Sequence, residues 1–467
     1  MKSELPVVVI GAGPVGLAAA AELAERGLPF QVLEAGERVG SNVRQWGHVR
    51  MFSPWEYDVS PIAQKLLEEI GWEAPPRDEM PTGRDVVERL LEPLAAHPRL
   101  RDAIRFGARV ESVSRVDHDA LRDGKGGSRE RAPFLVRVKT AAGEEDLRAK
   151  AVIDASGTWQ NPNPMGASGV PARGEPEARS ASITTYGMPD VLGADRGRYA
   201  GQRVLVIGGG HSAQGVIQDL VALRREAPST KVIWAVRAAN LSRVFGGGEK
   251  DQLPGRGLLG LAVKKLVESG GVEVVTSFSA AAVRRVESGD GWIVSSNDRD
   301  LEAVDRIVVA TGFRPDWSLE RELRLAIDPA TEAPAKLAPL IDPNVHSCGT
   351  VPPHGEAELR HPESDVYVVG MKSYGRAPTF LLRTGYEQVR SIVAALAGDT
   401  AAARRVELVL PETGVCSVPK PLRALAPLLP AVQALAGCCG GPAKSEAACC
   451  VADEQAKSAG KEGCGCS

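Results

Sequence analysis

The chain has 467 residues, of which 43% are hydrophobic and 25% are charged, and its formal net charge is −3. This composition is typical of a globular protein with two or three domains, and it excludes a strongly basic surface for nucleic acid or for a membrane. No apolar run approaches the roughly 18 residues that a membrane-spanning helix needs, and we expect no secretory leader, so the sequence predicts a cytoplasmic protein without a membrane partner.

A valine-rich strand is expected at residues 7–10, followed by a glycine-rich turn and a helix at 17–26. The turn has the spacing of a dinucleotide-binding fingerprint, whose glycines allow a tight turn, close approach of a pyrophosphate and close packing of the helix. The next strand, 30–34, ends at an acid that can accept a hydrogen bond from a ribose hydroxyl, which favours FAD or NAD over NADP. The residues expected to bind this dinucleotide are Gly11, Gly13, Pro14, Gly16 and Glu34.

A loop at 46–55 is dense in aromatic and polar side chains, unlike an ordinary linker. Trp46, Phe52 and Trp55 are expected either to form an apolar wall or to pack beneath the first cofactor, and we assign Trp46 to cofactor binding. Helices are expected at 62–70 and 84–96. Strands are expected at 109–116 and 134–139, joined by an exposed connection at 117–131, and a buried strand at 151–157 ends at Gly157.

A second fingerprint follows a valine-rich strand at 204–207. The strand after its helix, 231–236, ends at an arginine in place of the acid, and a guanidinium can bind a 2′-phosphate. We therefore expect NADPH at this second site, with NADH as the alternative. His211 is expected to bind a phosphate or to cap the helix. The residues assigned to this cofactor are Gly208, Gly210, His211, Ser212, Ala213, Arg237 and Arg243.

The strand at 307–310 leads into a turn with Thr311 and Gly312, which parallels the turn after the strand at 151–157. The chain is thus expected to leave a first domain at one turn and to return at the other. The pattern predicts an α/β protein in which an FAD-binding Rossmann-like domain with a β-meander contains an inserted NAD(P)-binding Rossmann-like domain. The expected divisions are 1–157, 158–304, 305–405 and a flexible Cys-rich tail at 406–467.

All eight cysteines lie at or after Cys348, and six fall in the last thirty residues. Clustered thiols in a cytosolic chain favour metal binding or redox chemistry over structural disulfides, and thiolates select soft, thiophilic centres. We expect the tail either to capture a metalloid or soft metal or to take no part in turnover. The candidate ligands are Cys438, Cys439, Cys449, Cys450, Cys464 and Cys466.

The segments 310–316 and 365–370 are similar to the Thr-Gly turn and the FAD-closing strand of two-dinucleotide-binding flavoproteins, in particular the flavin-dependent monooxygenases. The resemblance covers about residues 5 to 400. It implies that Gly370, Met371, Arg376 and Thr379 lie near the flavin ring. The stretch 186–201 lacks the histidine of the monooxygenase signature. The segments 208–213 and 370–376 resemble those of the flavoprotein monooxygenases encoded in bacterial arsenic-resistance operons.

Disulfide reductases of this type carry a redox-active cysteine pair beside the flavin or in the NADPH domain, and this chain has no cysteine in either place. The resemblance therefore implies an enzyme that uses NADPH, FAD and O₂ to oxidise a soft heteroatom, such as trivalent arsenic, in metalloid detoxification. His48, Arg50 and Arg376 are the candidate catalytic residues, and a homodimer is common in such proteins. The alternatives are a reductase of a metal ion or disulfide that uses the tail cysteines, and a metalloid-binding or delivery protein.

Overall fold

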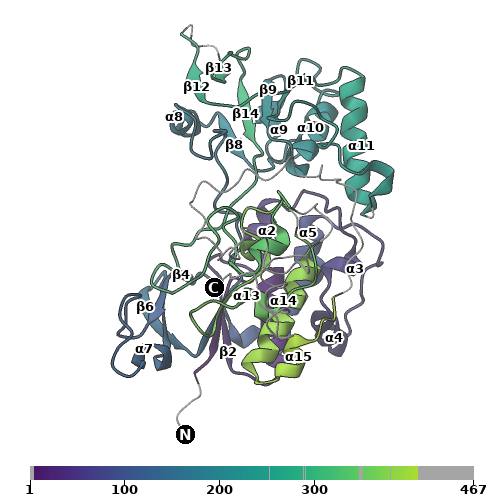
Figure 1. Ribbon diagram of the computed structural model, residues 1–467. Coiled ribbons are helices and arrows are strands. Elements are labelled where there is room, and N and C mark those ends of the chain that lie inside the picture. Colours follow the sequence, from purple (N-terminus) through teal and green to yellow (C-terminus); the bar gives the residue numbers. More distant parts are fainter. Residues whose placement is uncertain are drawn as a thin grey trace, which may run out of the picture. The chain divides into compact units, whose positions relative to one another are not determined.

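Two parallel five-stranded sheets form the framework of the computed structural model (Figure 1). The structure describes residues 5–408, except 252, 288, 290, 346–350 and 379. The strand order is β15-β7-β1-β2-β3 in the first sheet and β11-β10-β9-β14-β8 in the second. Each sheet has the parallel, doubly wound pattern of a Rossmann-like fold, which confirms the fold class predicted from the sequence.

The first sheet is buried on both faces. Its central strand β1 pairs in parallel with β2 and β7, so that Val9 lies opposite Val32 and Ile153. Successive side chains of a strand point to opposite faces, and accordingly Val9 joins one hydrophobic cluster while Val8 joins another. The strands are β1 (Val7–Ile10), β2 (Phe30–Leu33), β3 (Ile104–Arg105), β7 (Ala151–Asp154) and β15 (Val366–Val368).

Helices α1 (Pro14–Glu25) and α14 (Leu382–Leu396) pack against each other on one face of this sheet. Figure 1 shows α13 and α15 beside α14. The alanines at 18–21 are all buried, and their small side chains let α1 approach its neighbours closely. The remaining helices of this fold are α2 (Ser41–Gln45), α3 (Trp55–Asp58), α4 (Pro61–Glu69), α5 (Gly83–Val86), the π-helical η1 (Val87–Leu91), α6 (Glu92–Ala96), η2 (Arg101–Ala103), α12 (Ala338–Ile341), α13 (Glu356–Leu359), η4 (Gly370–Tyr374) and α15 (Thr400–Arg404).

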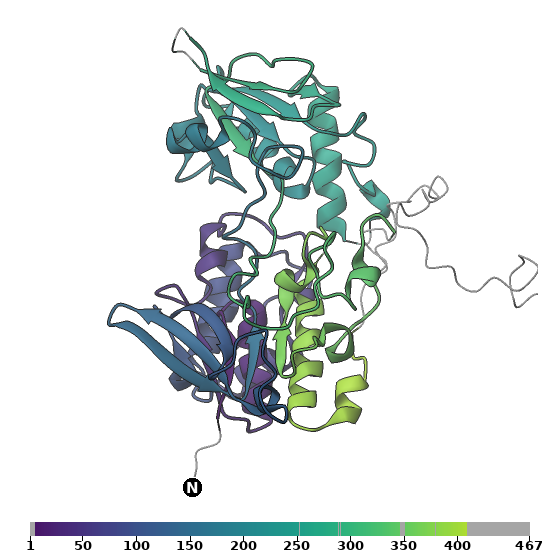
Figure 2. The same cartoon turned by 60° about the vertical axis from the view of Figure 1, so that its left-hand side comes forward.

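A three-stranded antiparallel meander covers the opposite face of the first sheet. It consists of β4 (Arg109–Arg115), β5 (Phe134–Thr140) and β6 (Gly143–Ala149), drawn in blue in Figure 2. The connection between β4 and β5 was expected to be exposed throughout, and this is wrong at helix α7 (Ser128–Arg131). The side chain of Arg129 is 2% exposed because its guanidinium pairs with Glu363 at 2.6 Å, a partner far away in the sequence.

The second sheet is likewise apolar on both faces, with Val206 in one cluster and Leu205 in another. Its strands are β8 (Thr184–Tyr186), β9 (Arg203–Ile207), β10 (Lys231–Ala235), β11 (Glu273–Val275) and β14 (Arg306–Val309). The elements around them are α8 (Glu175–Ser180), α9 (Arg196–Tyr199), α10 (His211–Leu223), η3 (Gly248–Lys250), α11 (Pro254–Glu268) and the hairpin of β12 (Ala282–Arg285) with β13 (Trp292–Ser295).

The whole second sheet is inserted between two neighbouring strands of the first, β7 and β15. Strand β14 pairs in parallel with β9, so this sheet extends past the boundary expected at residue 304. The chain therefore crosses between the two folds after β7 and again after β14. Within the described part of the chain, no helix has both the length and the apolar character required to cross a bilayer.

Candidate functional site

The first glycine turn joins β1 to α1, and its three glycines have different surroundings. Gly11 has φ +98°, and a Cβ there would lie 2.9 Å from the carbonyl oxygen of Ala155. A Cβ on Gly16 would lie 2.0 Å from the carbonyl oxygen of Gly11. A Cβ on Gly13 would meet no protein atom within 4 Å, because this residue borders an open cleft. The protein itself requires Gly11 and Gly16, whereas the space beside Gly13 suits a ligand.

Glu34, at the end of β2, is 9% exposed and lines the same cleft. One carboxylate oxygen accepts a hydrogen bond from the backbone N–H of Ala12 at 2.8 Å, and the other accepts one from that of Gly36 at 2.9 Å. Each oxygen has a second lone pair, so the carboxylate can still accept a hydrogen bond from a hydroxyl group. Its backbone partners also hold the glycine turn and the end of β2 together.

The second glycine turn repeats this arrangement between β9 and α10. Gly208 has φ +134°, and a Cβ there would lie 2.2 Å from the carbonyl oxygen of Ala310. Gly210 is the N-cap of α10, and a Cβ there would meet no protein atom within 4 Å. Ala213 is fully buried behind the turn and does not line the cleft. Both turns thus offer unpartnered helix N-termini with space for a phosphate.

The cleft between these turns has a volume of about 970 Å³. This is at the upper end of the range for small-molecule sites, which is about 300–1,000 Å³. Gly11, Gly13, Gly208, Gly210 and Glu34 line the cleft. The other sequence-predicted residues that line it are Pro14, Trp46, Arg50, Gly157, His211, Ser212, Arg237, Thr311, Gly312, Met371 and Arg376. Gly16, Arg243 and Gly370 lie outside the lining, and Thr379 is outside the described residues.

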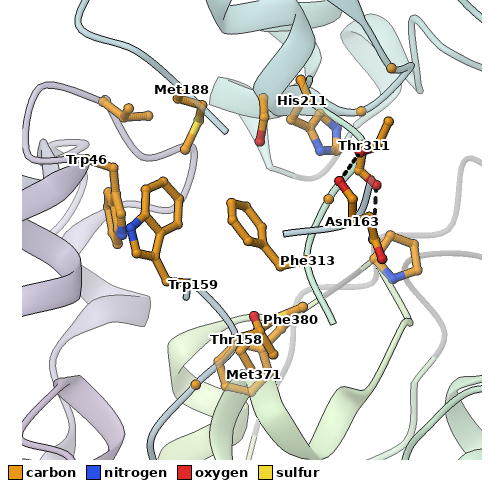
Figure 3. Close-up of a pocket in the computed structure, with 18 of the residues that line it drawn as sticks. Trp46, Thr158, Trp159, Asn163, Met188, His211, Thr311, Phe313, Met371 and Phe380 are labelled. Atoms are coloured by element: carbon orange, nitrogen blue, oxygen red, sulfur yellow. Dashed lines mark hydrogen bonds between the residues drawn. The ribbon is translucent and has the colours of Figure 1, made fainter. Parts of the chain in front are cut away.

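Aromatic side chains form one wall of the cleft (Figure 3). The rings of Trp159 and Phe313 stack with centroids 4.7 Å apart and planes 29° apart, and the centroid of Trp46 lies 6.4 Å from that of Trp159. The indole N–H of Trp159 donates to the side-chain oxygen of Gln45 at 2.9 Å, which fixes the ring. Trp159 and Phe313 were not predicted as site residues, although both are aromatic residues next to a predicted turn.

The two chain crossings are tied together at the cleft. The hydroxyl of Thr311 donates to the carbonyl oxygen of Asn163 at 2.9 Å, and the side-chain amide of Asn163 donates to the carbonyl oxygen of Thr311 at 3.2 Å (Figure 3). The backbone N–H of Asn163 also donates to the carbonyl oxygen of Gly312. The first crossing segment, at Asn163, is therefore in direct contact with the Thr311–Gly312 turn of the second.

Two cationic groups of the cleft have no partner in the described structure. The guanidinium groups of Arg237 and Arg376 are exposed, and neither makes a hydrogen bond or ion pair with a described residue. Arg237 follows β10, where a dinucleotide bound at the second turn would place its ribose. Arg243 is also exposed but does not reach the cleft. Arg237 is therefore the better placed of the two for a phosphate.

The structure separates the three candidate catalytic residues. Arg50 and Arg376 line the cleft, and Arg50 donates to the carbonyl oxygen of Met80 at 2.8 Å. His48 lines a second cavity of about 490 Å³ that shares Trp159 with the first. Trp55 is not part of the apolar wall, because it is 1% exposed and packs in the core of the first fold. Phe52 does line the cleft, where its ring lies 5.3 Å from that of His211.

His211 lies in the cleft, as predicted, at the first position of α10. Desolvation by the surrounding residues, followed by the charge of Arg256, lowers the pKa of His211. The imidazole is therefore neutral at pH 7, when it can donate one hydrogen bond and accept another.

A buried network supports the turn η4, whose residues the family resemblance implies to lie near the flavin. The side-chain oxygen of Gln388 accepts the backbone N–H of Gly370 at 2.8 Å, and its amide donates to His354 and to Ser373. The other ring nitrogen of His354 faces the carbonyl oxygen of Pro352 at 3.1 Å, which assigns the proton to Nδ1. Burial lowers the pKa of His354, so the ring stays a neutral acceptor for Gln388.

A buried ion cluster lies behind the same turn. The Lys372 ammonium contacts Asp154 and lies 3.1 Å from Glu320, and all three side chains are 1% exposed or less. Burial and then the negative charge of Asp154 raise the pKa of Glu320 well above its usual range. Burial opposes ionisation of Asp154 as well, but the charge of Lys372 holds the pKa of Asp154 below its usual range. The cluster thus contains one ammonium, one carboxylate and one neutral carboxyl group.

No group of three or more potential metal ligands occurs among the residues that the structure describes. All eight cysteines, including the six candidate ligands of the tail and Cys348 and Cys416, lie outside these residues. The described lining of the cleft accordingly contains no thiol.

Comparison with known proteins establishes the family. The family model of the pyridine nucleotide-disulphide oxidoreductases matches residues 5–351, and the chain belongs to this family. Ferredoxin–NADP reductase 1 of Cupriavidus taiwanensis is 27% identical over 335 residues, which cover 70% of this chain and 78% of that protein. The protein of the same name from Cupriavidus necator is 27% identical over 337 residues, 70% of this chain and 77% of that protein.

Solved structures show the same fold in proteins of different activity. Bacillithiol disulfide reductase from Bacillus cereus superimposes with a TM-score of 0.59 at 20% identity, covering 85% of this chain and 99% of that one. The FAD-bound cadaverine monooxygenase DfoA from Erwinia amylovora gives a TM-score of 0.60 at 14% identity, covering 89% and 99%. The chain is an enzyme of the flavin oxidoreductase class, and its cofactors are FAD and NADPH, as predicted.

Proposed function

We propose that this enzyme is an NADPH- and O₂-dependent FAD monooxygenase that oxidises a soft heteroatom, with trivalent inorganic or organic arsenic as its substrate class. The observation that carries the proposal is a cleft bordered by both dinucleotide turns whose described lining contains no cysteine. Among the described residues, no thiol pair borders the cleft to take electrons from a reduced flavin, and this favours O₂ as the acceptor. The role proposed in metalloid detoxification follows from this substrate class.

The proposed reaction is balanced with one molecule each of NADPH and O₂. NADPH and trivalent arsenic each provide two electrons. One oxygen atom forms a bond to arsenic, which becomes pentavalent, and the other leaves as water with the hydride of NADPH and one proton from solvent. When bound, FAD supplies the transfer of electrons from NADPH to O₂. The arsenic lone pair is the nucleophile that forms the new bond.

We assign the two cofactors by the groups that face each turn. FAD binds at the first turn, where Gly13 leaves space for the pyrophosphate and Glu34 can accept a ribose hydroxyl. NADPH binds at the second turn, where Gly210 leaves the equivalent space and Arg237 can pair with the 2′-phosphate. A carboxylate at Arg237's position would repel that phosphate, as Glu34 would at the first turn.

The chain's contribution to the chemistry is to orient the cofactors and exclude water. The stacked rings of Trp159 and Phe313, with Trp46 beside them, present an apolar wall that keeps bulk water from the reacting groups. The Arg376 guanidinium has no hydrogen-bond partner among the described residues, so it could donate hydrogen bonds to the flavin or the substrate. The Gln388 network holds the Gly370 backbone beside this site.

The proposal is tested by measuring oxygen uptake and NADPH oxidation by the purified flavoprotein with arsenite or methylarsenite. We expect the arsenical to accelerate both rates and to be converted to the pentavalent product at one equivalent per NADPH. NADPH oxidation that proceeds at the same rate without oxygen would contradict a monooxygenase.

A reductase is the second candidate, and it is favoured by the ferredoxin–NADP reductases among the relatives. In this case the electrons leave the flavin for a metal ion or a disulfide, with the tail cysteines as carriers. Replacing the six candidate ligand cysteines of the last thirty residues by serine distinguishes the two functions. A reductase that depends on these thiols loses turnover, whereas a monooxygenase retains arsenical-dependent oxygen uptake.

A further inference from the structure

A second cavity, with a volume of about 490 Å³, adjoins the cofactor cleft. The two cavities share Trp159 and Met188, so these side chains form a partition with one face toward each space. Figure 3 shows both residues on the side of the cleft where Trp46 lies. Two dinucleotides have to occupy the first cavity, and a substrate therefore needs a space of its own within reach of them.

Charged side chains of both signs line each cavity, but the second has three carboxylates where the described lining of the first has only that of Glu34. The charged residues of the second cavity are Arg44, Arg84, Glu88, Asp190 and Asp195. Arg44 is engaged by Glu92 at 2.6 Å, whereas the Arg84 guanidinium makes no hydrogen bond or ion pair with a described residue. Asp190 and Asp195 each accept one backbone N–H at 3.0 Å with one oxygen, which leaves the other oxygen of each carboxylate available.

His48 is the unsatisfied group of this cavity. Its Nε2 atom is buried and has no hydrogen-bond partner among the described residues. Buried polar atoms are nearly always paired, and an unpaired one indicates a missing partner such as a ligand or a water molecule. The imidazole nitrogen can donate or accept a hydrogen bond, depending on its tautomer.

We propose that the second cavity is the substrate chamber of the monooxygenase, that it takes a small uncharged molecule with several hydroxyl groups, and that His48 binds one of these hydroxyls. This inference rests on the proposed function. The trihydroxy form of trivalent arsenic has this chemistry, since it is a weak acid that is uncharged at neutral pH. Such a molecule can bind to the hydrogen-bond donors and the acceptors of this cavity. An anion would be repelled by the carboxylates, and a metal cation would be repelled by the guanidinium groups.

The same charges favour release of the product. Pentavalent arsenic oxyacids are stronger acids and are anionic at neutral pH. The carboxylates Glu88, Asp190 and Asp195 outnumber Arg84, so their net charge would repel this anion, while they can accept hydrogen bonds from the uncharged substrate. The partition residue Trp159 lies where the substrate has to pass from the chamber to the cofactor cleft. His48 thus becomes a substrate-binding residue, while Arg50 and Arg376 remain with the cofactor cleft.

Binding is tested first, without turnover, on the full-length holoenzyme. Arsenite is added in the absence of NADPH, and tryptophan emission is compared between the wild-type protein and the Trp159→Phe variant. We expect a saturable change in emission that the variant lacks. Thiols of the tail can bind arsenite in both proteins, so their contribution cancels in the difference. Equal changes in the two proteins at saturating arsenite would overturn the proposal.

The role of His48 is tested by steady-state kinetics with arsenite. Loss of one hydrogen bond of about 1.4 kcal/mol corresponds to a tenfold change in affinity, so we expect His48→Leu to raise the KM for arsenite about tenfold. The rise in the KM for NADPH is expected to be much smaller. His48→Gln keeps a polar group near the position of Nε2 and should recover part of the loss. His118→Leu, a half-buried histidine that lines neither cavity, is the control and should leave both KM values unchanged.

The outcomes separate this inference from the function on which it rests. A Trp159-dependent emission change without arsenite-stimulated NADPH oxidation would refute the monooxygenase and leave the binding chamber standing. Stimulated oxidation with an unchanged KM in His48→Leu and no Trp159-dependent signal would refute the chamber and leave the monooxygenase standing.

Discussion

At the scale of a single residue, we propose that Arg237 determines the preference for NADPH. Its guanidinium lines the cleft and makes no hydrogen bond or ion pair with a described residue. A charge-assisted hydrogen bond is worth about 1.5–3 kcal/mol, so Arg237→Gln is expected to raise the KM for NADPH by about one to two orders of magnitude. The KM for NADH should change little, because this cofactor has no 2′-phosphate.

Arg243 provides the matched control for this prediction. It is exposed close by in the sequence but lies outside the cleft, and Arg243→Gln should therefore have a smaller effect on NADPH. Equal losses for NADPH and NADH in the Arg237 variant would show that the residue supports the fold of the site and does not recognise the phosphate.

Asp58 is a buried acid whose contribution to the stability of the fold depends on pH. The residue is fully buried, one carboxyl oxygen accepts the Ser53 hydroxyl at 2.8 Å, and the other has no partner among the described residues. Burial raises the pKa of Asp58 to about 8. The folded protein therefore binds this proton more tightly than the unfolded chain does, and the resulting stability is greatest below pH 4 and is lost as the pH rises toward 8.

Asp58→Asn removes this titration. One pKa unit corresponds to about 1.4 kcal/mol, so the variant should gain stability relative to the wild type by up to about 1.4 kcal/mol per pH unit between pH 4 and 8. Urea unfolding of both proteins at pH 5 and pH 8 measures this difference. If the difference in the free energy of unfolding is the same at both pH values, Asp58 is ionised at a normal pKa.

At the scale of an element, two glycines of the first turn, between β1 and α1, are expected to have different roles. Gly13 leaves space for the ligand, and Gly16 allows the turn to pack against the helix. A Cβ at Gly13 meets no protein atom within 4 Å, whereas a Cβ at Gly16 would lie 2.0 Å from a backbone oxygen. We expect Gly13→Ala to keep the melting temperature of the apoprotein and to lose FAD affinity. Gly16→Ala should lower the melting temperature of the apoprotein.

Thermal unfolding of the apoproteins and FAD titration monitored by flavin fluorescence distinguish the two variants. A Gly13→Ala protein that binds FAD as the wild type does would remove the first turn from the flavin site. A Gly16→Ala protein with unchanged stability would mean that the turn can relax away from the helix.

These units could be predicted from the sequence because their residues are close together in the chain. The positions of Gly11, Gly13 and Glu34 follow from one strand, one turn and the next strand. Trp159 and the Gln388 network were missed, since their partners come from distant segments. Gln388 contacts Gly370 and His354, and no local pattern in the sequence links α14 to those loops. His48 was predicted as a site residue, but its separation from Arg50 depends on side-chain direction.

At the scale of the whole molecule, the Lys372 cluster joins three distant segments. Lys372 contacts Asp154 at the end of β7, before the first crossing, and Glu320, which follows the second crossing. Removing one member of a buried ion pair leaves an uncompensated charge and typically costs about 3–5 kcal/mol. We expect Lys372→Met to lose this much in the free energy of unfolding, measured by urea denaturation.

Glu320→Gln is the control within the same cluster. Glu320 is expected to be neutral at pH 7, because burial and Asp154 raise its pKa, so glutamine should be tolerated with a much smaller loss. Equal losses in the two variants would indicate that Glu320 is ionised and that the cluster has a different distribution of protons.

The insertion of one sheet within the other has a consequence for biosynthesis. A polypeptide emerging from the ribosome delivers β8 to β14 before β15 and α14, so the inner module can close while the outer sheet still lacks its edge strand and a covering helix. We therefore expect the outer module, to which we assign FAD, to fold last, after nearly four hundred residues have been translated. A nascent chain stalled ahead of β15 should retain the nicotinamide-binding module in folded form and yet fail to acquire colour.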